Sequence, residues 1–172
     1  MTRATTARAL VAGTGSLGIG FAALVALLRE EAKAARRKVE ARTNKQEQFV
    51  DGIYGRGRGR AKPLVFAVLG DSTAVGLGVE RAAETPGVLI ASALAELAER
   101  PVRLVRVAVT GAESRELDEQ VDRALPEKPD VALIMVGAND VTTFTKPALS
   151  VRHLENAVRR LIEAGCEVVV GT

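Results

Sequence analysis

The chain has 172 residues, of which 47% are hydrophobic and only 3% aromatic, and it contains no tryptophan. This size and apolar content exclude a chain that is disordered over its whole length. A core with so few aromatic residues must be built from Val, Leu, Ile and Ala, as in sheets covered by helices on both faces. The net charge of +3 is unevenly distributed: residues 1–62 hold 13 basic and 5 acidic residues, whereas residues 63–172 hold 11 basic and 16 acidic residues. A basic leader on an acidic remainder does not predict a domain that binds nucleic acid.

An apolar run lies near the start of the chain. Residues 9–28 are 20 consecutive uncharged residues, enough to cross a hydrocarbon layer of about 30 Å at about 1.5 Å per residue. No small-x-small cleavage site follows the run, which favours an uncleaved anchor over a signal peptide. We therefore predict that residues 1–28 form a membrane-type helix. Basic residues are denser after the run than before it, so the positive-inside rule favours the cytoplasmic face for the rest of the chain.

The glycines of this leader allow a second interpretation. Residues 13–18, Gly-Thr-Gly-Ser-Leu-Gly, match the G-x-G-x-x-G fingerprint of dinucleotide-binding proteins. That fingerprint needs a strand before it and a second strand after its helix, but a charged stretch follows here and no apolar strand begins before Leu64. A nucleotide-binding oxidoreductase is therefore an alternative that rests on these glycines alone.

Residues 29–62 have the composition of a charged helix followed by a linker. Residues 29–48 are rich in Ala, Glu, Lys and Arg, which are good helix formers, and they predict a solvated helix. Residues 55–60 alternate Gly with Arg, a pattern typical of flexible segments. We expect this basic tract to contact anionic lipid rather than nucleic acid. The expected macromolecular partner is thus the membrane, through residues 9–28.

Strand and helix patterns alternate in residues 63–172. Their order predicts a parallel sheet with helices on both faces, an α/β fold of the flavodoxin-like, three-layer α/β/α type. Functional residues of such a sheet gather at the carboxyl ends of its strands. The strand patterns cover 64–69, 102–109, 130–136 and 167–170, and the helix patterns between them cover 87–99, 114–124 and 149–164.

Polar motifs follow the first three predicted strands. They are Gly-Asp-Ser-Thr at 70–73, Thr-Gly-Ala-Glu at 110–113 and Gly-Ala-Asn-Asp at 137–140. A serine beside a glycine at a strand end can project its hydroxyl into a cleft, where backbone N–H groups and an Asn side chain can donate hydrogen bonds to one atom. Each motif alone is also a common turn or helix cap. Three of them in order predict a nucleophile with an oxyanion hole.

These motifs resemble the sequence blocks of one enzyme family. Gly70-Asp71-Ser72 resembles the first block of the SGNH/GDSL hydrolases, Gly111 stands where their second block keeps a glycine, and residues 137–140 resemble their G-x-N-D third block. The resemblance covers residues 64–172, and the third block is the most specific part of it.

The resemblance implies a function and a set of site residues. It implies an ester hydrolase that acts on a small-molecule or lipid ester, with Ser72 as the nucleophile. The Ser72 N–H, the Gly111 N–H and the Asn139 side chain would form the oxyanion hole, with Asp71 and Asp140 as supporting residues. Neither a metal nor an organic cofactor is implied.

One block of the family has no counterpart in the 172 residues. Family members carry a D-x-x-H block near the C-terminus that supplies the general base, whereas the single histidine here, His153, falls within a predicted helix, where a solvated or capping role is the ordinary interpretation. We therefore expect residues 63–172 to be a partial hydrolase domain, truncated at its C-terminal side, whose activity is very weak. The alternatives are a non-catalytic, membrane-tethered binding module or an inactive truncated gene product.

Overall fold

The computed structural model describes residues 30–31, 51–57 and 61–171. The chain divides into two units, residues 1–41 and residues 42–172. Of the first unit only Glu30 and Glu31 are described, and both are helical and exposed. The predicted anchor at residues 9–28 lies outside the described residues, as does nearly all of the predicted charged helix. Within the described part of the chain, no helix is both long and apolar enough to span a membrane.

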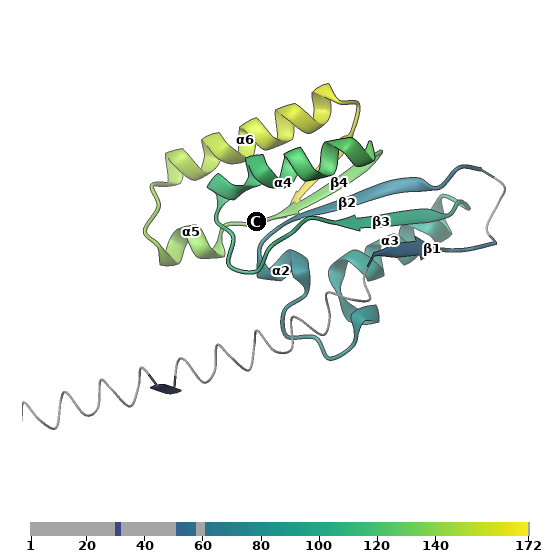
Figure 1. The fold of residues 1–172 in the computed structure, drawn as a ribbon, viewed down its shortest axis with the longest axis horizontal. Coiled ribbons are helices and arrows are strands. Elements are labelled where there is room, and N and C mark those ends of the chain that lie inside the picture. The colour runs from purple at the N-terminus through teal and green to yellow at the C-terminus, as the bar shows by residue number, and fades with distance from the viewer. Residues whose placement is uncertain (1–29, 32–50, 58–60, 172) are drawn as a thin grey trace, which may run out of the picture. The chain divides into compact units, whose positions relative to one another are not determined.

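The second unit contains a five-stranded sheet whose strand order is β1-β3-β2-β4-β5 (Figure 1). Its strands are β1 (Gly52–Tyr54), β2 (Leu64–Gly70), β3 (Val102–Arg106), β4 (Val131–Met135) and β5 (Glu167–Gly171). The last four are parallel, and β2 lies between β3 and β4, which is the arrangement of flavodoxin-like sheets. The prediction of an α/β fold with these four strands is confirmed.

Strand β1 makes the sheet mixed, so the prediction of an all-parallel sheet was wrong. It pairs antiparallel with β3, Gly52 lying opposite Leu104 and Tyr54 opposite Val102. The pairing continues through the carboxylate of Asp51, which accepts a hydrogen bond from the Arg106 N–H at 3.0 Å. Three residues that include a glycine give little strand signal, so the sequence pattern predicts a linker here. Their strand conformation comes from pairing with β3 rather than from their own propensity.

Helices cover both faces of the sheet. Figure 1 shows α4 and α6 on one face and α3 on the other. Two short helices, α2 and α5, follow β2 and β4 directly, at the carboxyl ends of those strands. The bounds are α2 (Ser72–Val75), α3 (Pro86–Leu97), α4 (Leu117–Ala124), α5 (Ala138–Thr142) and α6 (Pro147–Glu163), with single 3₁₀ turns η1 (Ala82–Glu84), η2 (Ser114–Glu116) and η3 (Leu125–Glu127).

The two cores meet at the central strand β2. Successive residues of a strand point to opposite faces, so an apolar strand without alternation serves two cores at once. On the face of α3, Phe66 and Val68 pack with Val88, Ala91, Ala95, Val102 and Leu104. On the face of α4 and α6, Ala67 and Leu69 pack with Leu117, Val121, Ala124, Ile134, Ala157 and Leu161. Burial on both sides holds β2 rigidly and fixes the position of the turn that follows it.

Candidate functional site

The turn after β2 starts at Gly70, which is packed directly against the next strand. Its backbone φ is 128°, a value that residues with a side chain rarely adopt. A Cβ at this position would lie 1.8 Å from the carbonyl oxygen of Met135. The next residue, Asp71, donates its backbone N–H to that same oxygen at 2.9 Å. On the other side, the Gly70 carbonyl accepts the N–H of Val109 at 3.0 Å. The turn is thereby bonded to both neighbouring chain segments.

Ser72 is the first residue of α2, and Asp71 caps that helix. The Asp71 side chain is only 1% exposed, and its Oδ1 accepts the Thr73 N–H at 2.8 Å. Ser72 is half-buried. Its backbone N–H has no hydrogen-bond partner among the described residues, as expected in the first turn of a helix. Ser72 thus offers both a hydroxyl and a free N–H at the carboxyl end of β2.

Gly111 is an exposed residue of the loop that joins β3 to η2. Its φ of 86° favours glycine, while a Cβ would meet nothing within 4 Å, so backbone conformation rather than space favours a glycine here. The loop is closed by a hydrogen bond of 3.1 Å from the Ala112 N–H to the Val109 carbonyl. Within the described part of the chain, the N–H of Gly111 has no partner.

Asn139 lies in α5 and connects the third motif to the second. Its Nδ2 donates to the carbonyl oxygen of Ala112, the residue after Gly111, at 2.9 Å. An amide nitrogen carries two hydrogens, and the second has no partner among residues 51–57 and 61–171. The structure therefore brings Asn139 to the Gly111 loop by a direct hydrogen bond. Ser72 is connected to the same edge through the bonds of Gly70 to Val109 and of Asp71 to Met135.

Asp140 is the buried centre of a second set of hydrogen bonds. Its Oδ1 accepts the hydroxyls of Ser114 at 2.6 Å and Ser150 at 2.8 Å, and its Oδ2 accepts the Ser114 N–H at 3.0 Å. The residue is 4% exposed. Burial raises the pKa of this carboxyl, but the hydrogen bonds from Ser114 and Ser150 outweigh burial and hold the pKa below its ordinary value of 3.8. Asp140 thus ties α5 to η2 and α6.

Sequence reasoning missed three polar side chains of this edge, Ser114, Ser150 and Gln120. The two serines gave no signal beyond that of ordinary helix-start residues. Gln120 of α4 is only 1% exposed; its Oε1 accepts the Gly70 N–H at 2.6 Å and its Nε2 donates to the Gly70 carbonyl at 3.0 Å. A signal did exist for it, because Gln120 falls on the helix face of Leu117, Val121 and Ala124, where an apolar residue is expected.

An open pocket of about 240 Å³ lies at this edge of the sheet. It is lined by residues from the ends of β2, β4 and β5 and from the short helices that follow, namely Asp71, Thr73, Met135, Val136, Ala138 and Gly171. Asp71 and Thr73 flank Ser72 on both sides in sequence. Among the described residues no group of three or more His, Cys, Asp or Glu side chains could hold a metal ion.

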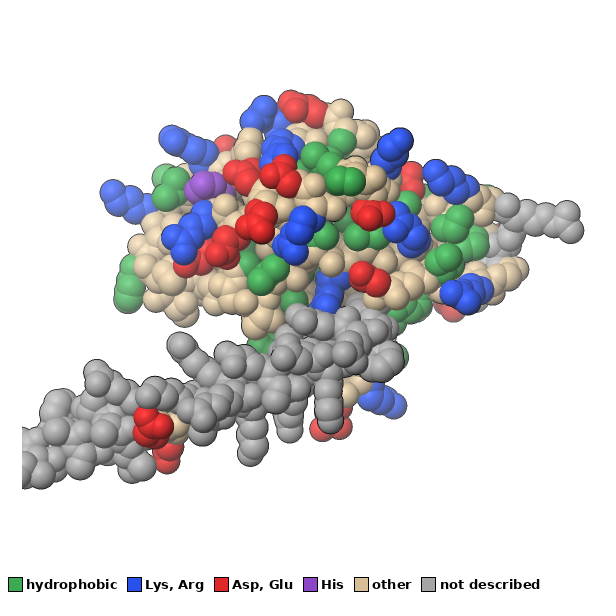
Figure 2. Space-filling model, viewed as in Figure 1, with side chains coloured by type: hydrophobic (Ala, Val, Ile, Leu, Met, Phe, Trp, Pro, Cys, Tyr) green, Lys and Arg blue, Asp and Glu red, His purple; other side chains and the backbone are tan. Residues whose placement is uncertain are grey.

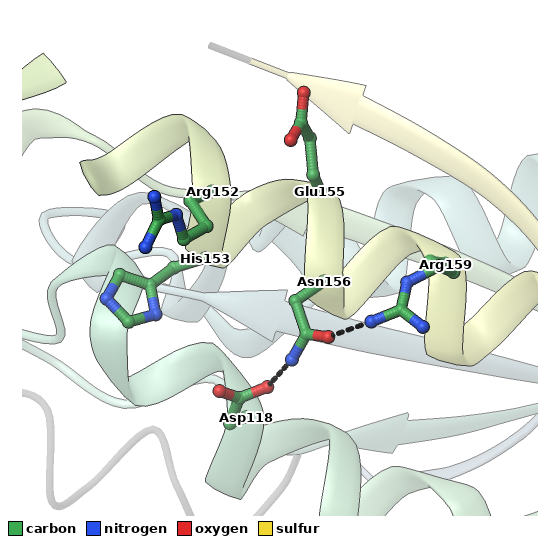
Figure 3. Close-up of a pocket in the computed structure, with 6 residues that line it drawn as sticks. All are labelled: Asp118, Arg152, His153, Glu155, Asn156 and Arg159. Atoms are coloured by element: carbon green, nitrogen blue, oxygen red, sulfur yellow. Dashed lines mark hydrogen bonds between the residues drawn. The ribbon is translucent and has the colours of Figure 1, made fainter. Parts of the chain in front are cut away.

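His153 lies in a different pocket. Figure 3 shows it beside Asp118 of α4, with Arg152, Glu155, Asn156 and Arg159 of α6. Asn156 bridges the pocket, because it donates to Asp118 Oδ1 at 2.5 Å and accepts from Arg159 at 2.5 Å. Acidic and basic side chains are interspersed over this face of the molecule (Figure 2). The pocket of Asp71 and Thr73 is lined by other residues, so the structure does not bring His153 to it.

Comparisons with known proteins bear on the same segment. The curated GDSL-like esterase Rv1075c of Mycobacterium tuberculosis (strain ATCC 25618 / H37Rv) is 38% identical over 180 residues, which cover 99% of this chain and 57% of that protein. The chain therefore spans little more than half the length of this relative.

Solved structures share the fold. AlinE4, a SGNH-hydrolase family esterase, matches with a TM-score of 0.58 at 21% identity, over 65% of this chain and 60% of that one. The psychrotrophic esterase EstA from Pseudoalteromonas sp. matches with a TM-score of 0.52 at 20% identity, over 62% and 57%. At such identities the likeness concerns the fold alone.

The family model gives the more specific result. The model of the GDSL-like Lipase/Acylhydrolase family matches residues 68–172, a range that includes all three strand-end motifs. The resemblance drawn from those motifs is confirmed: the chain belongs to the GDSL-like lipase/acylhydrolase family.

Proposed function

We propose that the second unit of the chain carries the nucleophile and oxyanion hole of a serine ester hydrolase. The observation that carries this proposal is the hydrogen bond from Asn139 to the Ala112 carbonyl, which joins the third motif to the second at the edge where Ser72 starts α2. Three N–H donors at this edge have no partner among the described residues: the backbone N–H groups of Ser72 and Gly111 and the second amide hydrogen of Asn139. Unpaired donors at one edge are what a developing oxyanion requires.

The proposed chemistry begins with attack of the Ser72 Oγ on the ester carbonyl carbon. As the tetrahedral intermediate forms, the negative charge on the former carbonyl oxygen is stabilised by the Ser72 N–H, the Gly111 N–H and the second amide hydrogen of Asn139. The alcohol then leaves, and water releases the acid from Ser72. A solvent water accepts the Ser72 proton and a proton is returned to the oxygen of the leaving alcohol; we do not assign this transfer to His153, because it lines the pocket between α4 and α6.

Asp71 and Asp140 act as supporting residues in this proposal. Asp71 fixes the first turn of α2 and so orients Ser72. Asp140 holds α5 against Ser114 and Ser150, and α5 carries Asn139. The role of both carboxylates is to hold other groups, although Asp71 also lines the pocket at this edge of the sheet. The pocket lined by Thr73, Met135 and Val136 is our candidate for the acyl or alcohol group of a small-molecule or lipid ester.

The test is hydrolysis of p-nitrophenyl acetate by the chain and by its Ser72→Ala variant. We expect Ser72→Ala to lose nearly all of the rate above background and to keep only a small residual rate. A matched control is Ser92→Ala, because Ser92 lies in α3 on the opposite face of the sheet from α4 and α6 and should leave the rate unchanged. Equal rates for the chain and for Ser72→Ala would refute the hydrolase and favour a binding module that keeps the cleft without the chemistry.

Membrane attachment through residues 9–28 is a separate proposal that rests on their uncharged sequence. We expect the full chain to sediment with vesicles of zwitterionic phospholipid, which offer no net charge to the basic tract, and a variant without residues 1–28 to stay in the supernatant. Equal sedimentation of the two proteins would refute the attachment, and it would leave the proposal about Ser72 untouched.

A further inference from the structure

The carboxamide of Gln120 binds Gly70 as a neighbouring peptide group would. Its Oε1 accepts the Gly70 N–H at 2.6 Å, and its Nε2 donates to the Gly70 carbonyl at 3.0 Å. One side chain thus satisfies both backbone groups of the residue that lies two positions before Ser72. Gln120 comes from α4, 50 residues further along the chain, and is 1% exposed.

The divergence of β3 from β2 explains why Gly70 needs such a partner. The regular register of β2 and β3 ends with Val68 opposite Arg106. Beyond that point the N–H groups of Val107 and Ala108 both bond to the single carbonyl of Val68, at 2.9 and 3.1 Å. The regular hydrogen-bond register between β2 and the segment after β3 is therefore interrupted. Within the described residues, the Gly70 N–H has no acceptor on that segment.

A second side chain of α4 supports this interpretation. Arg123, one turn after Gln120, donates from its guanidinium to the Val107 carbonyl at 2.8 Å. Residues three apart on a helix project from the same side. Gln120 and Arg123 together supply the hydrogen bonds that are lost where β2 and β3 part. Of the two, Gln120 is the one that contacts the turn of Ser72.

We propose that Gln120 is a positioning residue of the candidate site, which holds the Gly70 peptide so that Ser72 faces Asn139. Asp71 is bonded to β4 through Met135, and Gln120 holds the preceding residue from the side of α4. The turn is then fixed from two sides. Without Gln120 the Gly70 N–H loses its acceptor, and on this side only the bond from the Val109 N–H to the Gly70 carbonyl remains, so Ser72 moves relative to the oxyanion donors. The catalytic part of this inference rests on the proposed hydrolase function.

The first test measures the backbone and needs no activity. Gln120→Met keeps the length of the side chain and removes its hydrogen bonds, and we expect amide hydrogen exchange of Gly70 to accelerate on the order of tenfold or more. The Val65 N–H is the internal reference, because it bonds to Asp130 at the other end of β2 and should exchange as before. The matched control is Val121→Ala, a buried neighbour on α4 whose apolar side chain cannot form a hydrogen bond with Gly70. This variant should accelerate the exchange of both amides alike. Equal acceleration of Gly70 and Val65 in Gln120→Met would overturn the proposal.

The second test measures the Ser72-dependent hydrolysis of p-nitrophenyl acetate. We expect kcat of Gln120→Met to fall on the order of ten- to a hundredfold with little change in KM, while Val121→Ala keeps its rate below its unfolding temperature. An unchanged kcat in Gln120→Met would overturn the positioning role. A chain without any Ser72-dependent rate would instead refute the hydrolase, and the exchange experiment would still decide whether Gln120 holds the turn.

Gln120→Glu provides a pH-dependent rescue. A protonated carboxyl can donate to the Gly70 carbonyl and accept the Gly70 N–H, whereas an ionised carboxylate can only accept. We therefore expect the rate of Gln120→Glu, divided by that of the wild-type chain at the same pH, to rise as the pH falls. A ratio independent of pH would contradict the paired hydrogen bonds.

Discussion

The turns after β2 and after β4 use the same residue types but are held in different ways. Each begins with a glycine at large positive φ, 128° at Gly70 and 136° at Gly137, and each leads into a short helix. Helix α2 directly follows Asp71, and helix α5 contains Asp140. Gly70 is packed against the backbone of β4, and the carboxylate of Asp71 accepts its hydrogen bond from Thr73 of the helix that it caps. Gly137 has open space around it, and the stabilising contacts of this turn come from Asp140, which binds Ser114 of another element.

The difference shows how a rigid site can be assembled from similar motifs. The turn of Ser72 is fixed by backbone packing and by Gln120, so little freedom remains at the nucleophile. The turn of Asn139 is fixed by a carboxylate that binds two serines from separate elements. We expect the first turn to be sensitive to added atoms and the second to be sensitive to lost hydrogen bonds.

The largest expected effect concerns the two glycines. Gly70→Ala places a Cβ 1.8 Å from the Met135 oxygen, so β2 and β4 must separate, and we expect a chain that does not unfold cooperatively. Gly137→Ala adds only backbone strain, which costs about 1–3 kcal/mol of the free energy of unfolding. Urea denaturation followed by circular dichroism measures both. Similar losses in the two variants would mean that the turns are not held differently.

The next effect concerns the two aspartates. Asp140→Ala leaves the Ser114 N–H and two hydroxyls without their acceptor, and we expect a loss of about 3 kcal/mol in the free energy of unfolding. Asp71→Ala removes one helix cap, at about 1 kcal/mol. The control is Asp122→Ala, an exposed partner of Arg160 worth about 0.5 kcal/mol or less. The reverse order of Asp71 and Asp140 would refute the long-range role of Asp140.

The smallest effect is the pH dependence of Asp140. Because the folded-state pKa lies below the ordinary 3.8, the ionised carboxylate stabilises the fold above that pH, and the contribution is lost as the pH falls through the folded pKa. The difference in free energy of unfolding between the wild-type chain and Asp140→Asn should be constant above about pH 5 and should shrink below pH 3.8. A difference that grows on acidification would show that the pKa is raised instead.

Much of the fold could be predicted from the sequence, because apolar runs such as 64–69 identify buried strands and the helix pattern over 87–99 coincides with α3. Strand β1 could not, since its three residues become a strand only by pairing with β3. The motifs at Ser72, Gly111 and Asn139 predicted that these residues follow strands of the sheet, and they indicated the family that the chain resembles. The contacts of Gln120, Ser114 and Ser150 could not be predicted, because their partners are far along the sequence and are set by packing of α4 and α6 against the sheet.

The central claim is that Ser72 and Asn139 act on the same ester carbonyl group. The Ser72 Oγ attacks its carbon, and the Asn139 amide donates to its oxygen. It is tested most directly by the rates of p-nitrophenyl acetate hydrolysis of the wild-type chain, Ser72→Ala, Asn139→Ala and the double variant, with Asn156→Ala as a matched asparagine outside the site. We predict that Asn139→Ala lowers the wild-type rate on the order of a hundredfold but lowers the residual rate of Ser72→Ala much less, because without attack by the Ser72 Oγ the ester carbonyl is no longer held with its oxygen at the Asn139 amide. Equal fold losses from Asn139→Ala in both backgrounds would contradict the account.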